Sequence, residues 1–395
     1  MINLSTWQKE FDPFGPYDEE VAEEISRLFK DRNYFINQDT RKIRGEYKEF
    51  ILSKLPNKYN EISYAVSGSE ALEHAIIISR KITGKKKILV FNGCYNGSSM
   101  QLLPISYPEF DDTNNDSYLR IDPPYCYRCD YRKQCVGDSL PCIQRIEEIV
   151  QLCRDSLSGI FVDPSFGNIL LSPPKVFFVA LRNLCNNYGI QLIFDETRTA
   201  FGRKGCLFSF TTLPIYPDIL VLNKSLACGI PLALTIYQKD RLDARDIIEM
   251  QIRETTFSGN MITLGISRIA IQHFQKCFNQ DLYNQKVESI LNGLTQLLKY
   301  PIIGDIRNFG MMFAIEVIGP RKEYDRLNSL SILRQLYVKH QIIIHPPNYK
   351  SIILLYPMLT ITLDDISYII SSFDKVIAGH SEKRFKSLQN SRLCD

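Results

Sequence analysis

The sequence has no long apolar segment and little net charge. No run approaches the roughly 20 apolar residues that a membrane-spanning helix needs, and the first residues, MINLSTWQKEFDPFG, contain no apolar core of a secretion signal. The formal net charge of the 395 residues is +3, which is too small to favour a nucleic-acid partner. We therefore expect a cytoplasmic protein that binds neither membranes nor nucleic acid.

Histidine is also scarce, and the cysteines do not suggest disulfides. The five His residues are scattered without the spacing of metal ligands, so we expect each to be structural or exposed. The 11 Cys residues are an odd number in a chain with no export signal, which favours reduced or metal-bound thiols over disulfide bridges. Internal repeats and low-complexity linkers are absent as well, and the length suits one large domain with a smaller one.

Short apolar, β-branched runs alternate with helical patterns through the middle of the chain. The predicted strands are Lys86–Phe91, Gly159–Pro164, Ile190–Glu196, Asp218–Lys224 and Leu232–Gln238, and the predicted helices include Ser69–Thr83 and Val176–Tyr188. Continuous apolar strands separated by helices are typical of an α/β fold with a mainly parallel sheet covered on both faces. We assign residues 59–283 to this large domain.

The pattern changes after this domain. Helical segments at Val287–Leu298 and Leu330–Lys339 alternate with short strands such as IRNFGMMFAIEV, which indicates a smaller α+β domain over residues 284–395. Residues 1–58 hold two amphipathic helical segments and little strand, and we expect them to pack with the smaller domain.

Two polar turns precede predicted helices and offer donors for an anion. Ser67-Gly68-Ser69 follows a strand and opens a helix, whose first N–H groups favour negative charge, although such a turn is more often only a helix cap. Thr255, Thr256 and Ser258 come before another helix, where the simpler interpretation is an ordinary polar turn. Either turn is a candidate phosphate site.

Charged residues end two apolar strands, at the edge of a parallel sheet where ligands bind. Asp195 needs a partner for its buried carboxylate, which can be a metal, a protonated ring nitrogen, or simply Arg198 or Arg203. Lys224 either extends its amine to solvent or forms a Schiff base. A Lys for an aldehyde, an Asp for a pyridine nitrogen and donors for a phosphate together match the needs of pyridoxal phosphate.

At this point the sequence resembles the class III aminotransferases, which have the aspartate-aminotransferase fold (fold type I of the pyridoxal-phosphate enzymes). The resemblance spans about residues 19–373. Its motifs are SGSEA, GCYNG, VDPSFGN, DETRTAFGR, PDILVLNKSLACGIPLA, TTFSGN and IRNFGMMFAIEV, in this order. Such an ordered set is far more specific than any single motif.

The resemblance implies a role for each motif residue. Lys224 would bind the cofactor aldehyde covalently and carry the proton, and Asp195 would keep the ring nitrogen protonated. Tyr95 would stack on the ring, and Thr256 would reach the phosphate of the partner subunit in a homodimer with shared sites. The implied cofactor-binding residues are Ser67, Gly68, Ser69, Tyr95, Asn96, Asp195, Arg198, Lys224 and Thr256.

The sequence departs from the family pattern in its substrate pocket. Leu354 stands where many members carry an Arg that binds a substrate carboxylate, and Asn168 stands where some carry the Glu that pairs with it. Arg198 replaces the usual Gln beside the cofactor's phenolic oxygen, and Asn96 replaces the His of a YHG motif. We expect the usual carboxylate clamp to be absent. The substrate is then an amine, amino aldehyde, amino sugar or carrier-bound carbonyl, or its carboxylate is bound by another Arg such as Arg198.

Four cysteines lie close together in the segment PPYCYRCDYRKQC and just after it. Cys126, Cys129, Cys135 and Cys142 have a spacing that can complete a zinc or iron–sulfur site, and reduced thiols in a surface loop are the simpler alternative. Some γ-aminobutyrate-type members carry a similar insertion with an iron–sulfur cluster. The resemblance therefore favours iron–sulfur over zinc.

The motifs identify the cofactor more sharply than the reaction. We expect an aminotransferase that moves an amino group between an amine or ω-amino donor and a carbonyl acceptor. The same Lys224 and Asp195 would also serve a decarboxylase, an aminomutase or an enzyme that forms carbon–carbon bonds. A further alternative is a catalytically inactive relative that binds cofactor or metal.

Overall fold

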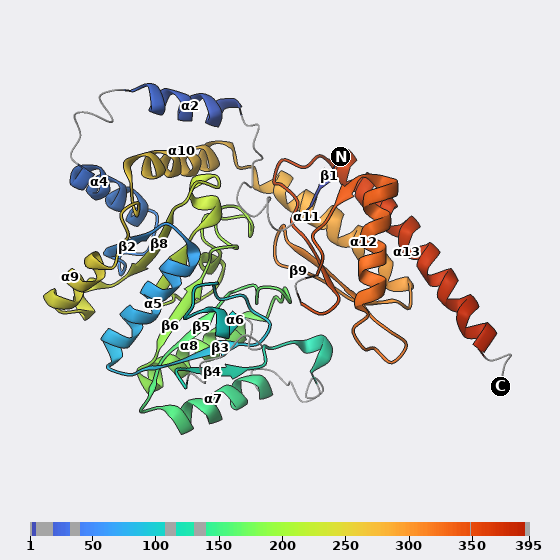
Figure 1. Cartoon of the computed structure of the whole chain (residues 1–395), viewed down its shortest axis with the longest axis horizontal. Coiled ribbons are helices and arrows are strands. Elements are labelled where there is room, and N and C mark those ends of the chain that lie inside the picture. Colours follow the sequence, from blue (N-terminus) through green and yellow to red (C-terminus); the bar gives the residue numbers. More distant parts are fainter. Residues whose placement is uncertain are drawn as a thin grey trace. The chain divides into compact units, whose positions relative to one another are not determined.

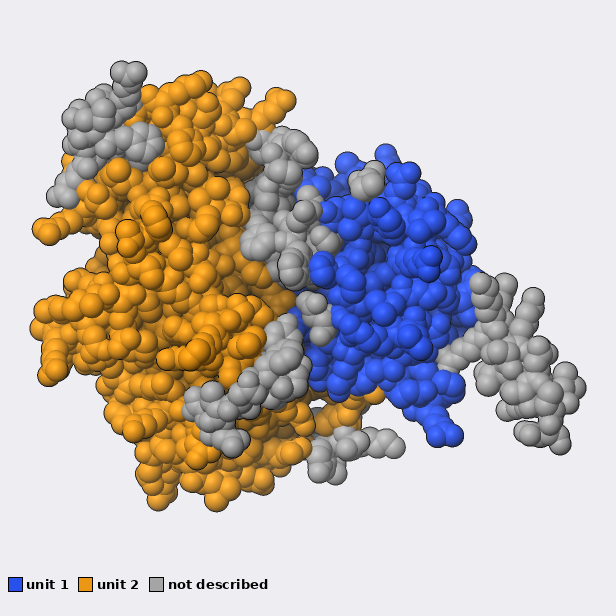
Figure 2. All heavy atoms as spheres, viewed as in Figure 1, with its two compact units in different colours: residues 1–15, 168–172, 279–395 blue, residues 16–167, 173–278 orange. Residues whose placement is uncertain are grey.

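The computed structural model describes residues 2–4, 19–31, 40–106, 116–129, 140–347 and 349–391, with side chains to residue 381. The chain forms two compact units (Figure 2). Residues 16–167 and 173–278 make up the larger unit, and residues 1–15, 168–172 and 279–395 make up the smaller one. We describe each unit by itself.

The larger unit is built on a seven-stranded sheet with the order β2-β8-β7-β6-β5-β3-β4. Its strands are β2 (Glu61–Ala65), β3 (Lys87–Phe91), β4 (Tyr118–Ile121), β5 (Leu157–Val162), β6 (Gln191–Asp195), β7 (Ile219–Leu222) and β8 (Ala233–Tyr237). The five strands from β7 to β4 are parallel, while β8 is antiparallel to both of its neighbours. The predicted α/β fold with a mainly parallel sheet is confirmed.

Helices cover both faces of this sheet (Figure 1). The described helices of the larger unit are α2 (Glu19–Lys30), α4 (Thr40–Leu52), α5 (Gly68–Thr83), α6 (Leu103–Ser106), α7 (Pro141–Cys153), α8 (Lys175–Tyr188), α9 (Ala244–Ile252) and α10 (Met261–Cys277). Successive strand residues point to opposite faces. In β6, Ile193 packs into the core cluster of α5, and Phe194 lies with its ring centroid 6.1 Å from that of Phe178 in α8. The two helices therefore cover opposite faces.

Several predicted elements agree with the structure to within a few residues. The predicted helices Ser69–Thr83 and Val176–Tyr188 correspond to α5 and α8. The strand predicted to end at Lys224 ends earlier, at Leu222, because Lys224 adopts a positive φ of 50° and opens a short 3-10 helix, η5 (Lys224–Ala227). The difference places Lys224 in a turn beyond the strand.

The N-terminal prediction needs correction. Of residues 1–58, only β1 (Ile2–Asn3) in the described part pairs within the smaller unit, where it runs parallel to β11 (Ile342–Ile343). Helices α2 and α4 both contact α10 of the larger unit. Tyr47 of α4 is buried there, and its hydroxyl lies 2.6 Å from that of Ser267. The amphipathic periodicity predicted an apolar face on each helix, but it did not indicate that this face packs against α10.

The smaller unit is an α+β assembly, as predicted. Its three-stranded antiparallel sheet has the order β12-β10-β9, formed by β9 (Ile303–Asn308), β10 (Phe313–Val317) and β12 (Ile352–Leu355). Its helices are α11 (Gln280–Thr295), η7 (Gln296–Lys299), α12 (Arg326–His340) and α13 (Leu363–Ser391). The segment 168–172, which follows β5 of the larger unit in the chain, also belongs to this unit.

In the part of the chain that the structure describes, no helix is both long enough and apolar enough to cross a membrane.

Candidate active site

The Ser67–Ser69 turn opens α5 at the carboxyl edge of the sheet. Ser67 is the N-cap, and its hydroxyl oxygen accepts a hydrogen bond from the Glu70 N–H at 3.2 Å. Gly68 and Ser69 are then the first helical residues, whose N–H groups have no acceptor within a helix. These N–H groups and the helix dipole make the turn suited to an anion.

Asp195 ends β6 and is almost fully buried. Burial raises the pKa of its carboxyl group from 3.8 to about 6, and the nearby carboxylate of Asp163 adds to the rise. Hydrogen bonds from Thr197, including its N–H at 2.9 Å, and the Arg198 charge act in the opposite direction. A buried carboxylate of this kind favours a cationic partner.

Glu196, the next residue, has a different partner. Its two carboxylate oxygens accept hydrogen bonds from the N–H groups of Ser209 and Phe210, each at 2.6 Å. Complete burial raises its pKa to about 7. Glu196 therefore anchors the turn η4 (Ser209–Thr212).

Sequence reasoning missed Asp163, which follows β5 directly and is buried beside Asp195. One of its oxygens accepts hydrogen bonds from Ser165, at 2.8 Å from the N–H and 2.7 Å from the hydroxyl group. The other oxygen lies 3.8 Å from Nε of the buried Arg198. The signal was available, because Asp163, like Asp195, is an acid at the end of an apolar strand.

Asp163, Asp195 and Arg198 form a buried charge cluster. Two carboxylates and one guanidinium leave one excess negative charge when all three groups are ionised. Gly167 leaves room for this cluster, since a Cβ atom there would lie 2.9 Å from Nη2 of Arg198. A bound cation near Asp195 would balance the excess charge and lower the pKa of that carboxyl group.

Lys224 lies on the same edge of the sheet. It follows β7, which pairs with β6 so that Asp195 is opposite Val221. Its positive φ of 50° turns the chain into η5, and its side chain is half-buried. The preceding Asn223 donates a side-chain hydrogen bond to the Leu232 carbonyl at 2.8 Å, which ties this turn to the start of β8.

The α5 turn, the residues after β6 and the turn after β7 converge at Gly68. A Cβ atom on Gly68 would lie 3.4 Å from Oδ1 of Asn223 and 3.5 Å from Cγ2 of Thr197. Gly68 thus approaches the residues adjacent to both Asp195 and Lys224. The structure therefore brings the predicted anion turn, the acid and the Lys to one place.

The GCYNG loop joins the same cluster. Gly167 lies so close to the loop that a Cβ atom there would be 3.2 Å from Cα of Cys94 and 3.3 Å from N of Tyr95. Tyr95 is half-buried, and its stacking on a cofactor ring remains a prediction. The N–H of Ser98 donates to Oγ of Ser69 at 3.0 Å, which joins the loop to the start of α5.

Asn96 has a supporting position in this loop. Its side chain is buried and donates to the Ile105 carbonyl at 3.4 Å, while its backbone N–H donates to Oγ of Ser106 at 2.8 Å. These bonds attach the loop to α6. The direct cofactor contact predicted for the Asn96 side chain remains a prediction.

The TTFSGN loop also lies near the start of α5. Ser258 is buried, and its hydroxyl group lies 3.4 Å from a carboxylate oxygen of Glu70. Thr256 and Phe257 are exposed on the surface of the single chain.

Two of the four positions that depart from the family pattern, Leu354 and Asn168, lie in the smaller unit. Leu354 is a buried residue of β12, opposite Ala314 of β10. Asn168 is also buried. An apolar side chain at Leu354 cannot bind a carboxylate by charge, as the sequence indicated.

The predicted cysteine site is only partly described. Cys126 is exposed, Cys129 and Cys142 are half-buried, and Cys135 lies outside the described residues. Among the residues that the structure describes, the groups of three ligand atoms close enough for one metal do not include Cys126, Cys129 or Cys142. Metal binding by these four cysteines therefore remains a prediction.

The charges and donors of the site suit pyridoxal phosphate. The start of α5 suits the phosphate, the excess negative charge at Asp195 suits a protonated ring nitrogen, and Lys224 offers a primary amine to an aldehyde. Tyr95 is placed near this cluster by Gly167. All of these residues belong to the larger unit.

Comparison with known proteins agrees with this assignment. The family model of the class III aminotransferases matches residues 26–377. The chain is 30% identical over 279 residues to the 5-aminovalerate aminotransferase of Pseudomonas putida, a match that covers 69% of this chain and 64% of that relative. It is 28% identical over 331 residues to the 4-aminobutyrate aminotransferase of Escherichia coli, which covers 80% of this chain and 75% of that relative.

The fold is shared with solved structures. An aminotransferase of Bacillus anthracis superposes with a TM-score of 0.81 at 21% identity, over 92% of this chain and 86% of the other.

Proposed function

Since the chain belongs to the class III aminotransferases, we propose that it transfers an amino group from an amine or ω-amino donor to a carbonyl acceptor with pyridoxal phosphate. The observation that carries this proposal is the convergence at Gly68 of the residues next to Asp195 and Lys224. The match to the Pseudomonas putida relative spans 64% of that protein, so its substrate does not transfer directly.

When bound, pyridoxal phosphate supplies an electron-withdrawing ring that makes the substrate C–H bond acidic. Asp195 would accept a hydrogen bond from the protonated ring nitrogen and keep its proton in place. The Nζ atom of Lys224 would carry the proton between the substrate carbon and the cofactor's C4′ carbon.

The phosphate would be bound at the start of α5. The N–H groups of Gly68 and Ser69 would donate to it. Because Oγ of Ser69 accepts the Ser98 N–H, its own hydrogen can be directed to the anion. Arg198, placed by Asp163 and Gly167, would lie beside the ring and stabilise negative charge on it.

The substrate proposal rests on Leu354 and Asn168. Both members of the usual Arg–Glu pair are replaced together, so neither leaves an unpaired buried charge. We propose that the donor lacks a carboxylate at this position, or that Arg198 binds it instead. In a half-reaction screen, rapid turnover of both γ-aminobutyrate and glutamate that is unaffected by Arg198→Ala would contradict this proposal.

We also propose a homodimer with shared sites. Phe257, next to Thr256, exposes 72% of its surface in the single chain, and a large exposed apolar side chain in a cofactor motif favours burial by a second copy. Thr256 would then reach the phosphate of the partner's site.

An iron–sulfur cluster on Cys126, Cys129, Cys135 and Cys142 remains a narrower proposal, supported by their spacing and by the similar insertion in some γ-aminobutyrate-type relatives. Anaerobic purification followed by iron and sulfide analysis tests it. A stable protein that contains no metal after such purification would contradict the proposed cluster.

Borohydride reduction tests the central proposal. Reduced, cofactor-saturated protein should carry a pyridoxyl group on the peptide that contains Lys224. Lys224→Ala should lose it, while the control Lys204→Ala, which changes another half-buried Lys, should keep it. An unlabelled Lys224 in intact, cofactor-saturated protein would contradict the enzyme assignment.

The reaction itself needs a second measurement. An amine donor without acceptor should convert the bound cofactor to pyridoxamine phosphate and release a carbonyl product. Release of carbon dioxide, or of an isomerised amine, would instead identify a decarboxylase or an aminomutase.

A further inference from the structure

The surface where α2 meets α10 carries three side chains of metal-binding type. Glu20 comes from the first turn of α2, and His273 and Cys277 come from the last turns of α10. One carboxylate oxygen, one imidazole nitrogen and the sulfur all lie within 4.8 Å of one another. We propose that these three residues bind one zinc ion, or a similar borderline-soft divalent cation, and that this ion attaches α2 to α10.

The geometry supports this site at each ligand. His273 and Cys277 are four residues apart on one helix, which places them on the same face. Nδ1 of His273 lies 3.8 Å from the sulfur of Cys277 and 3.8 Å from Oε2 of Glu20. Zinc bonds of about 2.0 to 2.3 Å in a tetrahedron bring ligand atoms to such separations after a small contraction.

Glu20 is also oriented by a second contact. Its other oxygen, Oε1, forms an ion pair with Lys276. Oε2 can therefore face a metal while Oε1 keeps its bond to Lys276, the arrangement in which an outer partner orients a ligating carboxylate. The Lys276 charge lowers affinity somewhat, but it does not compete for the ligand atom.

The kind of ligand selects the metal. A thiolate and an imidazole favour zinc, cobalt or a similar ion, whereas magnesium and calcium prefer sites made entirely of oxygen ligands. Glu20 and Cys277 are exposed and His273 is buried, so the ion can enter from solvent against a fixed imidazole. Three protein ligands leave a fourth position for water.

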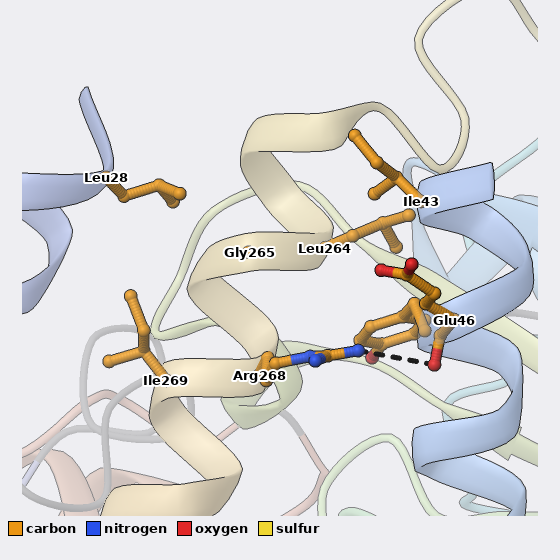
Figure 3. Close-up of a pocket in the computed structure, with 8 residues that line it drawn as sticks. Leu28, Ile43, Glu46, Leu264, Gly265, Arg268 and Ile269 are labelled. Carbon is orange, nitrogen blue, oxygen red and sulfur yellow. Dashed lines mark hydrogen bonds between the residues drawn. The ribbon is translucent and has the colours of Figure 1, made fainter. Parts of the chain in front are cut away.

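The packing of α2 gives such an ion a structural role. Of the 12 residues of α2, all of them described, only Val21 is buried. Figure 3 shows Leu28 of α2 pointing toward α10 across a pocket of about 220 Å³, which is also lined by Ile43 of α4 and Leu264 of α10. Apolar contact therefore holds α2 weakly. A metal bound near its first turn would hold the helix in place (Figure 1).

The test uses cobalt as a spectroscopic probe on the full chain. To silence the other cysteine cluster, Cys126, Cys129, Cys135 and Cys142 are all replaced by Ser. Cobalt titration of this protein should give one equivalent of a thiolate-to-cobalt charge-transfer band, which zinc removes. Cys277→Ser should abolish the band, and Cys153→Ser, a control at the end of α7, should keep it.

A second readout follows α2 itself. The parent protein for this readout is the variant in which the four clustered cysteines are replaced by Ser. Zinc should slow amide hydrogen exchange in its residues 19–31 and should leave exchange unchanged when Cys277→Ser is added. Glu20→Gln changes an exposed residue and should weaken zinc binding by at least about tenfold, the loss typical even for changes around metal ligands. An equal cobalt band in Cys277→Ser and Cys153→Ser, or no zinc bound by the parent protein, would overturn the proposal.

Discussion

At Gly167 the chain passes between three groups of the candidate site. Its φ of 52° lies in the left-handed region, and an added Cβ atom would lie 2.9 Å from Nη2 of Arg198 and 3.2 Å from Cα of Cys94. A side chain would therefore be strained and would also displace the guanidinium that Asp163 contacts. Gly84 has a similar φ of 69° but no atom within 4 Å of its Cβ position.

These two glycines make a matched pair. Gly84→Ala should cost about 1 kcal/mol of unfolding free energy, from backbone strain alone. Gly167→Ala should cost about 2 to 4 kcal/mol, because overpacking adds to the same strain. Urea unfolding of both variants measures the difference. Equal losses would show that the crowding around Gly167 relaxes freely.

Asp195 gives the cofactor-free protein a pH dependence. Its folded pKa, about 6, is above the ordinary value of 3.8 that the unfolded chain should show. Between these values the folded protein retains a proton that the unfolded chain has lost. The unfolding free energy should therefore fall as pH rises through this window, by about 3 kcal/mol for this group.

Asp195→Asn should remove that part of the slope. Glu196, whose pKa is raised to about 7, should also make the unfolding free energy fall as pH rises. This fall should remain in the wild-type protein and in Asp195→Asn, and it serves as the internal control. Saturating pyridoxal phosphate should flatten the slope of the wild-type protein, since a cation beside Asp195 lowers its pKa. Urea unfolding at several pH values, with and without cofactor, measures both effects. An unchanged slope in Asp195→Asn would refute this account.

At the scale of elements, Arg307 of β9 secures the segment 168–172. Its Nε and Nη2 atoms donate to the carbonyls of Leu170 and Ile169 at 3.1 and 3.0 Å. Its Nη1 atom donates to Asp305 at 2.7 Å and to the fully buried Glu316 at 3.1 Å. One guanidinium thus joins two strands and a segment distant in the sequence, all within the smaller unit.

Removing this guanidinium should have a large effect. Arg307→Met should cost about 3 to 5 kcal/mol, because it leaves the Glu316 carboxylate buried without its guanidinium partner. Amides of residues 168–172 should exchange faster. The control is Arg253→Met, which removes an exposed ion pair with Glu249 and should leave both measurements unchanged. A small effect of Arg307→Met would show that water or another group replaces its bonds.

Local sequence patterns predicted the helices and strands better than they predicted which of them pack together. The strands of the large sheet were recognisable because continuous apolar runs such as ILVF need burial on both faces. The Arg307 contacts to Leu170 and Ile169 join residues more than 130 positions apart, and no local pattern indicates them. For the same reason α2 and α4 were assigned to the wrong unit.

The candidate site was predictable where a motif fixed the residue. Lys224, Asp195 and Ser67–Ser69 were identified from strand ends and the family resemblance. Asp163 was overlooked although it obeys the same rule. In the cluster of Glu20, His273 and Cys277, the four-residue spacing of His273 and Cys277 could be read from the sequence, but Glu20 lies about 250 residues away and no local pattern indicates its contact with them.

At the scale of the whole molecule, the proposed homodimer predicts complementation. Lys224→Ala removes the reactive amine of its own site, and Thr256→Val should weaken phosphate binding only in the partner's site. A mixed dimer of the two variants then contains one intact site. Unfolding and refolding the variants together, at limiting pyridoxal phosphate, should restore activity that neither variant has alone.

Two further measurements are needed to interpret the complementation experiment. Light scattering gives the mass of the wild-type protein, which should be twice that of the 45.6 kDa chain. Wild-type protein mixed with Lys224→Ala controls for losses during refolding. A monomeric mass, or no recovery in a confirmed mixed dimer, would contradict shared sites.

The pairing of β1 with β11 affects how the protein matures on the ribosome. Ile2 and Asn3 are translated about 340 residues before their partners, Ile342 and Ile343. The larger unit can fold once residue 278 has emerged, while β1 must wait for more than 60 further residues before its partner exists. The pairing of β1 with β11 can therefore form only after the whole of the larger unit has been made, and it shows that synthesis has passed Ile343.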